Sequence, residues 1–120
     1  MRQQGLLRGP FLRYLLLLAL ACGLTPRGYC DSVAETTCAR LFACTTGAAE
    51  RSALTSVYAD EATCTKTFKT RSLCETQTEA SLCKGQSWVP ANASVCVEEL
   101  RTLPCEQLAT YRPTCVPPCR

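Results

Sequence analysis

Cysteine is the residue whose number and spacing set the chemistry open to this chain. Eleven of the 120 residues are cysteine and none is histidine. The missing histidine removes Ser–His and Cys–His catalysis, imidazole metal ligands and imidazole proton transfer. No two cysteines have the C-x-x-C spacing of thioredoxin-like redox motifs, and the most closely spaced pair is Cys115 and Cys119. The cysteines therefore favour disulfide bonds, and we expect no metal and no cofactor.

Two pairs of adjacent carboxylates, Asp60 with Glu61 and Glu98 with Glu99, are the other groups suited to acid–base chemistry. Neighbouring residues on a helix do not face each other, so neither pair is arranged to act on one substrate atom. Asp60 and Glu61 suit a helix start, where the helix dipole favours negative charge. Glu98 and Glu99 suit a solvated helix face. We therefore expect no catalytic residue and no enzyme activity.

An apolar run that ends in a cysteine, LLLLALAC at residues 15–22, indicates export. It follows three arginines, Arg2, Arg8 and Arg13, and no acidic residue precedes it, which is the layout of a signal peptide. The run holds about eight apolar residues, far fewer than the roughly 20 that a membrane-spanning helix needs. The sequence therefore predicts a removable signal peptide at residues 1–21.

Two kinds of processing fit the end of this signal. The small residue Ala21 directly before Cys22 resembles the lipobox of bacterial lipoproteins, in which the cysteine becomes the acylated first residue. The large aliphatic residue usual three places before that cysteine is Ala19 here, so ordinary cleavage after Ala21 is the alternative. We expect Cys22 to be a lipid anchor, and ordinary cleavage would give a freely secreted protein.

The cysteine count fits an acylated Cys22. An odd number of cysteines leaves one thiol unpaired in an exported protein, and removing Cys22 leaves ten that can form five disulfides. Cleavage directly after Cys22 would leave the same ten, so the count alone does not establish the lipid. The ten are Cys30, Cys38, Cys44, Cys64, Cys74, Cys83, Cys96, Cys105, Cys115 and Cys119.

The mature part of the chain is balanced in charge. The formal net charge of +3 comes from the signal, and without its arginines ten basic and ten acidic side chains remain. This balance gives no basic surface for nucleic acid. Roughly 90 residues form one small domain with a marginal core, for which disulfides compensate. We expect a short tether at residues 22–29 and one cysteine-rich helical domain at residues 30–119.

Three segments have the apolar spacing of helices. They cover residues 32–43, about 61–72, and 90 or 92 to just before Pro104. In each, a cysteine is followed four residues later by a large apolar side chain, which places both on one face. Residues 45–57 favour a loop or a weak helical turn, and residues 75–89 an irregular segment. The fold class predicted is all-α, a small disulfide-stapled bundle of three to four short helices with irregular loops.

If the first two helices form an antiparallel hairpin, their geometry predicts which cysteines pair. The end of the first helix then meets the start of the second, and the reverse holds at the other end. The expected bonds are Cys44–Cys64, Cys30–Cys74 and, from the middle of the first helix to the third, Cys38–Cys96. The remaining four cysteines, Cys83, Cys105, Cys115 and Cys119, would lock the C-terminal loop and tail.

The chain resembles a group of uncharacterised small cysteine-rich lipoproteins of Gram-negative bacteria. The resemblance rests on YADEATC at residues 58–64 and on WVPANASVCVEELRTLPC at residues 88–105, followed by a final proline-flanked cysteine. It implies a cell-envelope location and no known activity. The single tryptophan, Trp88, is either core filler or a contact for a partner.

These features together lead to one functional expectation and one alternative. The expectation is an exported, lipid-anchored envelope protein that acts as a binding or structural module. Its partners would be the membrane, through an acylated Cys22, and a protein or glycan, with no nucleic acid. The alternative is a freely secreted disulfide-rich effector or inhibitor-like module.

Overall fold

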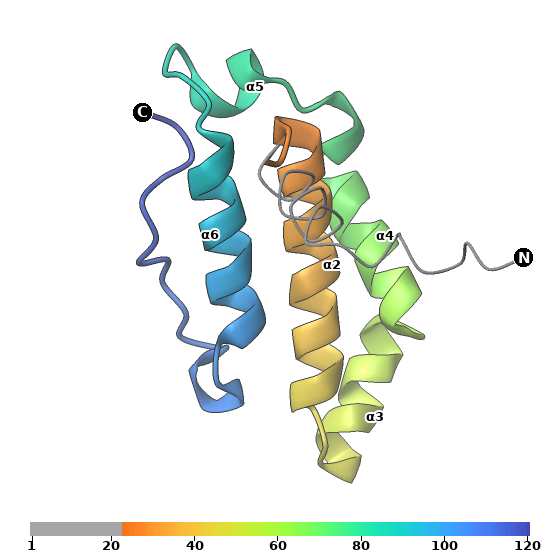
Figure 1. Ribbon diagram of the computed structural model, residues 1–120. Coiled ribbons are helices and arrows are strands. Elements are labelled where there is room, and N and C mark those ends of the chain that lie inside the picture. The colour runs from red at the N-terminus through yellow and green to blue at the C-terminus, as the bar shows by residue number, and fades with distance from the viewer. Residues whose placement is uncertain (1–22) are drawn as a thin grey trace, which may run out of the picture.

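Five α-helices and two short 3-10 helices make up the regular structure of residues 23–120, the part of the chain that this computed structural model describes (Figure 1). Within those residues there is no strand, only one isolated bridge between Trp88 and Cys119. The all-α, disulfide-stapled fold predicted from the sequence is confirmed. The elements are α2 (Pro26–Cys44), α3 (Ala48–Val57), α4 (Glu61–Arg71), η1 (Cys74–Thr76), α5 (Glu79–Cys83), α6 (Pro90–Thr102) and η2 (Cys105–Gln107).

Helix α2 begins six residues earlier than residue 32, where the sequence predicts its start. Thr25 caps it, because its hydroxyl accepts a hydrogen bond of 3.0 Å from the N–H of Gly28. Pro26 follows at the first helical position, where proline is favoured. The prediction of a tether is therefore wrong for residues 23–29, which belong to the folded domain. Residue 22 lies outside the described part of the chain.

Helix α3 replaces the loop or weak turn predicted at residues 45–57. It spans ten residues and none of them is buried, although Ala49, Ala53 and Val57 recur at intervals of four along one face. Arg51 fastens it to the end of α2, donating to the carbonyl oxygens of Phe42 at 2.5 Å and Thr45 at 3.2 Å. The same guanidinium lies 5.5 Å from the centre of the Phe42 ring, a cation–π contact.

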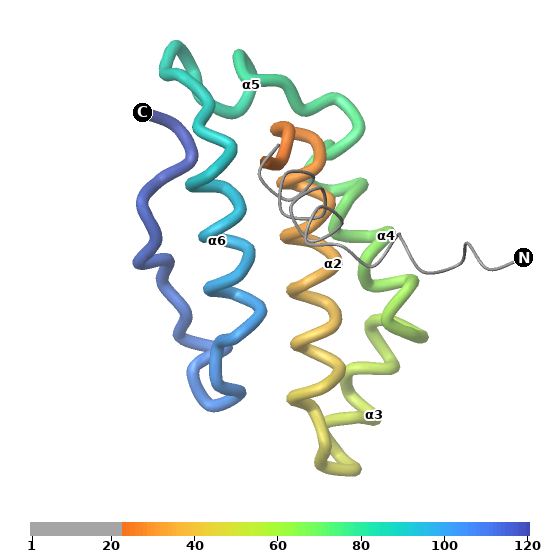
Figure 2. The backbone as a smooth tube through the Cα atoms, viewed as in Figure 1, coloured from red at the N-terminus to blue at the C-terminus, as the bar shows by residue number. Residues whose placement is uncertain are grey.

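The three longest helices form a layer with α2 in the middle (Figures 1 and 2). Helix α2 packs against α4 on one side and α6 on the other. Helix α4 runs antiparallel to α2, as the predicted hairpin requires, and α6 runs in the same direction as α2. The α3 helix lies at one end of the layer and α5 at the other. Among residues 23–120, no helix therefore lies above one face of α2.

The segment after α6 returns along that helix to the end where α2 begins (Figure 2). Ser87 and Arg120 exchange backbone hydrogen bonds of 2.7 and 3.0 Å, and Val89 donates to Pro118 at 2.7 Å. These contacts fix the tail beside the start of α6. Backbone hydrogen bonds therefore hold the tail in addition to the disulfides.

Five disulfides join these elements and use all ten cysteines of the described residues. Three of them start from α2 and reach η1, α4 and η2. The other two hold the tail to α5 and α6. The pairs are Cys30–Cys74, Cys38–Cys64, Cys44–Cys105, Cys83–Cys119 and Cys96–Cys115.

One of the three predicted pairs is present and two are wrong. The bond between Cys30 and Cys74 is the one that the hairpin predicts. Cys64 bonds to Cys38 in the middle of α2, with 5.9 Å between their Cα atoms, and not to Cys44. Helix α3 is the reason, because it occupies the far end of α2 and places the first turn of α4 opposite the middle of that helix.

The second wrong pair follows from the first. Cys38 is taken by Cys64, so Cys96 bonds instead to Cys115 in the tail. Cys44, at the end of α2, is then near η2 and bonds to Cys105. A single unpredicted helix thus changes the partners of four cysteines assigned in the prediction.

Sulfur fills most of the interior. The largest fully buried side chains are Cys38, Cys64 and Cys74. Leu100 and Leu103 are the large aliphatic side chains among the buried residues, and the others are alanine and cysteine. Phe42 and Phe68, which share a helix face with these cysteines, are only half-buried. Crosslinks therefore take over much of the role that large apolar side chains have in an ordinary core.

Candidate functional site

An apolar groove lies over the uncovered face of α2, between α4 and α6. We define it by Val33, Thr37, Leu41, Phe68, Leu100 and Leu108. Its main hollow has a volume of about 570 Å³, and a second hollow of about 340 Å³ shares Val33, Thr37 and Phe68 with it. The second hollow continues toward Tyr29 and Leu82, near the start of α2.

The floor and the walls of the apolar groove come from different elements. Val33, Thr37 and Leu41 follow one another at intervals of four along α2, so they lie on one helix face and form the floor. Phe68 of α4 and Leu100 of α6 stand on either side. A fully packed bundle would bury such side chains, and here Val33, Leu41 and Phe68 stay partly accessible.

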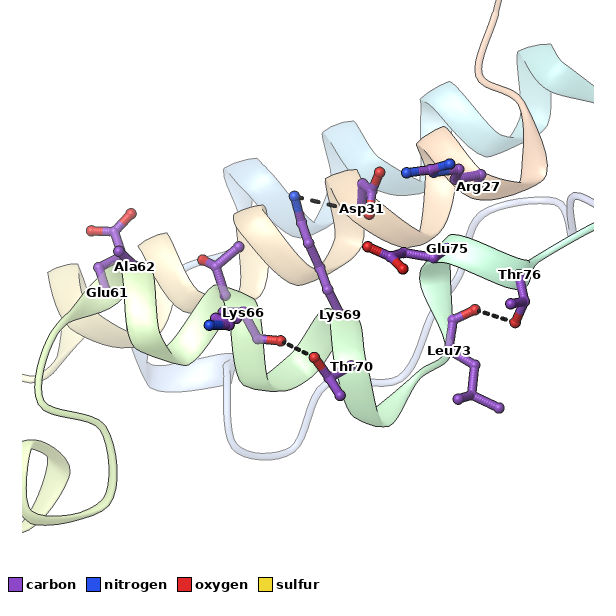
Figure 3. Close-up of a pocket in the computed structure, with 11 residues that line it drawn as sticks. Arg27, Asp31, Glu61, Ala62, Lys66, Lys69, Thr70, Leu73, Glu75 and Thr76 are labelled. Atoms are coloured by element: carbon purple, nitrogen blue, oxygen red, sulfur yellow. Dashed lines mark hydrogen bonds and ion pairs between the residues drawn. The ribbon is translucent and has the colours of Figure 1, made fainter.

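A larger polar groove of about 880 Å³ lies on another side of the α2–α4 pair (Figure 3). Its basic side chains are Arg27, Lys66 and Lys69, and its acidic ones are Asp31, Glu61 and Glu75. Equal numbers of opposite charges give little net attraction for a charged ligand. The polar groove is therefore the weaker candidate for recognition in spite of its size.

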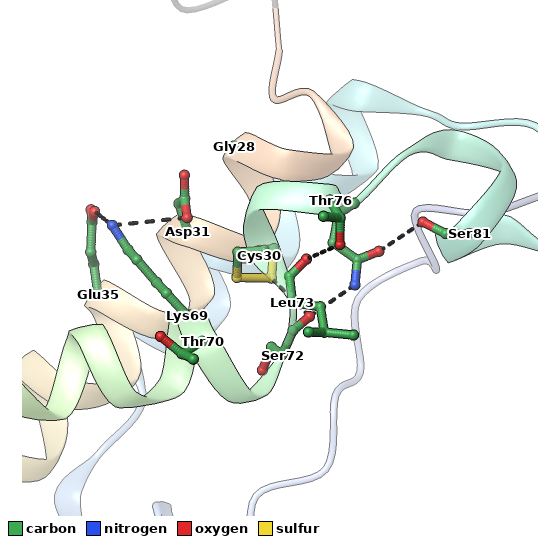
Figure 4. Close-up of a disulfide and its surroundings, with 12 residues drawn as sticks. Gly28, Cys30, Asp31, Glu35, Lys69, Thr70, Ser72, Leu73, Thr76 and Ser81 are labelled. Carbon is green, nitrogen blue, oxygen red and sulfur yellow. Dashed lines mark hydrogen bonds and ion pairs between the residues drawn. A yellow bond between two sulfur atoms is a disulfide. The ribbon is translucent and has the colours of Figure 1, made fainter.

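Lys69 in this groove links α4 to α2. Its ammonium is 2.6 Å from a carboxylate oxygen of Glu35 and 3.9 Å from one of Asp31 (Figure 4). The hydrogen bond to Glu35 raises the pKa of Lys69 above its ordinary value, with the charges of Glu35 and Asp31 acting in the same direction. Lys69 is thus held as a charged link and is not poised to lose its proton in a reaction.

The Cys30–Cys74 bond stands at the end of α4 in a set of short-range hydrogen bonds (Figure 4). The side chain of Gln77 donates to the carbonyl oxygen of Ser72 at 3.0 Å, and Thr76 donates to that of Leu73 at 3.1 Å. Leu73 has a φ of 52°, which L-residues rarely adopt. Cys74 is fully buried, so this bond is structural.

Three of the four carboxylates considered for catalysis have structural partners, namely Asp60, Glu98 and Glu99. Asp60 caps α4, accepting from the N–H of Thr63 at 2.7 Å, and this contact lowers the pKa of Asp60. Glu98 pairs with Arg101 on the same helix. Glu99 binds the C-terminal tail through Thr114. These contacts give the carboxylates structural roles.

Trp88 lies half-buried where the N-terminal segment meets the start of α6. Its indole N–H donates to the carbonyl oxygen of Leu24 at 2.7 Å. The Tyr29 ring lies 5.6 Å away at an angle of 60°, and burial raises the pKa of Tyr29. Of the two predicted roles for Trp88, the structure shows a packing and hydrogen-bonding one.

The structure bears on metal sites and membrane-spanning helices only for residues 23–120. There, no cluster of His, Cys, Asp or Glu side chains is arranged to hold a metal ion. No helix in this part combines the length and hydropathy that crossing a membrane requires. Cys22, the predicted lipid anchor, lies outside the described residues.

The apolar groove was not foreseen from the sequence. The spacing of Val33, Thr37 and Leu41 was the available signal, since residues at intervals of four share a face. That pattern alone indicates a buried stripe. Only the layered arrangement of the three helices shows that the stripe is left open.

The chain matches no protein-family model, no curated protein and no solved structure in the comparisons made with each. The candidate site therefore rests on the geometry described above.

Proposed function

We propose that the protein is an exported binding module of the cell envelope, anchored by a lipid on Cys22, whose apolar groove receives the apolar face of a helix from another protein. The disulfide-rich structure is that of an extracellular or secreted module, since such crosslinks persist in oxidising compartments. The signal segment and the resemblance to small lipoproteins support the anchor.

The observation that supports the binding role is that disulfides fill the interior while large apolar side chains stay accessible at the surface. Disulfides supply the interior, and Val33, Leu41 and Phe68 remain accessible along one groove. A stripe at intervals of four beside two flanking helices is the surface into which an amphipathic helix packs.

The lining favours a protein helix over a glycan as partner. The main hollow contains no charged side chain, and its polar groups are the hydroxyls of Thr37, Thr45 and Tyr111. A sugar ring needs several hydrogen-bond partners, because its own hydroxyls lose water on binding. A helix presents apolar side chains and keeps its backbone groups satisfied internally.

Site-specific photo-crosslinking in intact cells tests the binding role. A photoreactive residue at position 108 should give a discrete adduct with one protein. Thr37→Arg, in the floor of the apolar groove, should remove that adduct. Thr70→Arg, in the polar groove, should leave it unchanged. An adduct that persists in the Thr37→Arg variant would show that the partner does not bind in the apolar groove. The same conclusion would follow if the protein without Thr37→Arg gave no adduct from position 108.

The lipid on Cys22 is tested independently of the groove. The same test distinguishes a lipid-anchored protein from a freely secreted one. Metabolic labelling with a fatty-acid analogue should mark the protein, and Cys22→Ser should abolish the label and release the protein from the membrane fraction. Stable attachment needs more than one acyl chain, which a processed lipoprotein carries. An unlabelled protein found in the medium would support the freely secreted module.

A further inference from the structure

The first two described residues are fixed to the body of the domain. Gly23 has a φ of +64°, and a Cβ atom at that position would lie 2.3 Å from the Cβ of Pro90. Only glycine allows this approach. The next residue, Leu24, accepts the indole N–H of Trp88 at 2.7 Å. The chain is thus held against the start of α6 from its first described residue.

This contact leaves no spacer between Cys22 and the domain. Consecutive Cα atoms are about 3.8 Å apart, so a lipid on Cys22 would join the protein one residue before the Gly23–Pro90 contact. We propose that the end of the domain formed by residues 23–27, residues 84–90 and Arg120, here called the anchor end, lies directly on the bilayer surface. This inference rests on the lipid anchor of the proposed function.

The composition of the anchor end suits a headgroup layer. Lys84, Arg27 and Arg120 are exposed there, and their long side chains can reach lipid phosphates. Trp88 of the anchor end packs against Tyr29 just beyond it, and both are aromatic residues with a polar atom, a type common at membrane interfaces. The acidic side chain of Glu79 accepts the backbone N–H of Trp88 at 3.1 Å. Gly85 follows α5 and has no atom within 4 Å of a Cβ placed on it.

The anchor end also fixes which way the layer of helices points. Helix α2 begins at Pro26, has 19 residues, and therefore extends about 28 Å away from the attachment point. Figure 1 shows α5 and the start of α6 at the same end as the start of α2, with α3 at the other end. The bilayer would face the first group, and α3 would point away from it. The apolar groove, which runs along α2, would then open sideways.

The chain's single tryptophan makes the orientation measurable. The acylated protein, purified from the envelope, is placed in phosphatidylcholine vesicles that contain a headgroup spin-labelled lipid. Trp88 fluorescence should be quenched several-fold more than that of a tryptophan placed at position 57 by the pair Trp88→Phe and Val57→Trp. Val57 is 69% exposed at the end of α3, so it accepts the larger side chain. Equal or weaker quenching of Trp88 would overturn the inference.

A second measurement uses the unaltered protein, in case Trp88→Phe disturbs the anchor end. A water-soluble amine reagent should modify Lys84 several-fold more slowly in vesicles than in detergent. Lys66, exposed on α4, should react at the same rate in both. Equal rates for Lys84 would contradict the orientation even if the lipid is present. A protein that takes up no fatty-acid label and does not bind vesicles would instead refute the anchor itself.

Discussion

The carboxylate of Glu99 on α6 holds Thr114 of the tail by two hydrogen bonds, from the backbone N–H at 2.8 Å and from the hydroxyl at 2.6 Å. The N–H of Cys115 donates to the same carboxylate at 2.8 Å. The Thr114 hydroxyl contributes most to lowering the pKa of Glu99 below its ordinary value of 4.5, and the two backbone bonds add to it. The charged form of Glu99 therefore stabilises the folded tail.

We expect Glu99→Gln to weaken the dependence of stability on acid. A group with a lowered pKa in the folded state contributes fully above its ordinary pKa, and the contribution is lost as the pH falls through the folded pKa. The wild-type melting temperature should therefore fall as the pH drops below 4.5, the ordinary pKa of this group, and that of Glu99→Gln should start lower and fall less. Melting curves followed by circular dichroism measure both slopes.

The cap residue Asp60 supplies the control for this experiment. Its pKa is also lowered, by its hydrogen bonds with Thr63, and it stands on α4, far along the chain from the tail. Asp60→Asn should remove a separate part of the acid dependence, and the two effects should add. Equal slopes for Glu99→Gln and wild type would show that the tail contact does not depend on the charge.

The buried Cys38–Cys64 bond should contribute more to the free energy of unfolding than the length of the loop it closes suggests. Replacing both cysteines by alanine should cost about 3 to 4 kcal/mol in chain entropy, plus a term for the void left by two fully buried sulfurs. Loop length alone ranks the Cys83–Cys119 bond higher, because it spans 36 residues against 26. Urea unfolding of both double variants decides between the two rankings. A greater loss without Cys83–Cys119 would show that chain entropy dominates.

Arg40 of α2 should stabilise the end of α6. Its guanidinium donates to the carbonyl oxygen of Leu103 and lies 3.7 Å from the sulfur of Cys105. The Nε of Arg40 is buried without a hydrogen-bond partner, which reduces the net gain. We expect Arg40→Met to cost about 1 to 2 kcal/mol in urea unfolding. Arg40→Lys should cost less, because the positive charge at the helix end remains.

A surface arginine gives the matching control. Arg101 pairs with Glu98 one turn away on α6, and both side chains are exposed. Such pairs contribute little, so Arg101→Met should change stability by less than about 0.5 kcal/mol. Similar losses for Arg40→Met and Arg101→Met would mean that the contact with Leu103 is no more than a surface interaction.

Gly23→Ala should detach the N-terminal residues from α6. The added Cβ cannot share space with Pro90, so the hydrogen bond between Leu24 and Trp88 should break and the emission of Trp88 should move to longer wavelength. Gly85→Ala has a positive φ as well but no atom within 4 Å of the new carbon. It should leave the emission unchanged. A red shift in both variants, or in neither, would contradict the steric account.

Local sequence signals are sufficient to predict the positions of helices α4 and α6. Asp60 marks the start of α4 and Pro90 that of α6, and both predicted helices end within one or two residues of the observed ones. The sequence does not reveal that Thr25 caps α2, because the glycines and the proline of residues 23–29 are typical of a tether. Helix α3 is absent from the prediction because its residues are mostly small or polar. Its apolar residues Ala49, Ala53 and Val57 do recur at intervals of four, but they stay exposed in the structure.

The pairing of the cysteines and the apolar groove cannot be predicted from local sequence patterns, because both depend on how the helices are placed relative to one another. The partner of Cys38 depends on how far α4 is displaced along α2, and that displacement depends on α3. The groove exists because α4 and α6 flank α2 and, within residues 23–120, leave Val33 and Leu41 partly accessible. Helix periodicity identifies the face but not whether another element covers it.

The connectivity of the five bonds has a consequence for how the protein is made. None of them joins two cysteines that follow each other along the chain, and Cys44 must find Cys105, 61 residues later. An oxidase that meets the chain as it emerges, N-terminus first, encounters Cys30, Cys38 and Cys44 before any native partner. Premature bonds among them can be corrected only by thiol–disulfide exchange. We therefore expect maturation to depend on a disulfide isomerase, and cells without one to accumulate the protein with scrambled bonds.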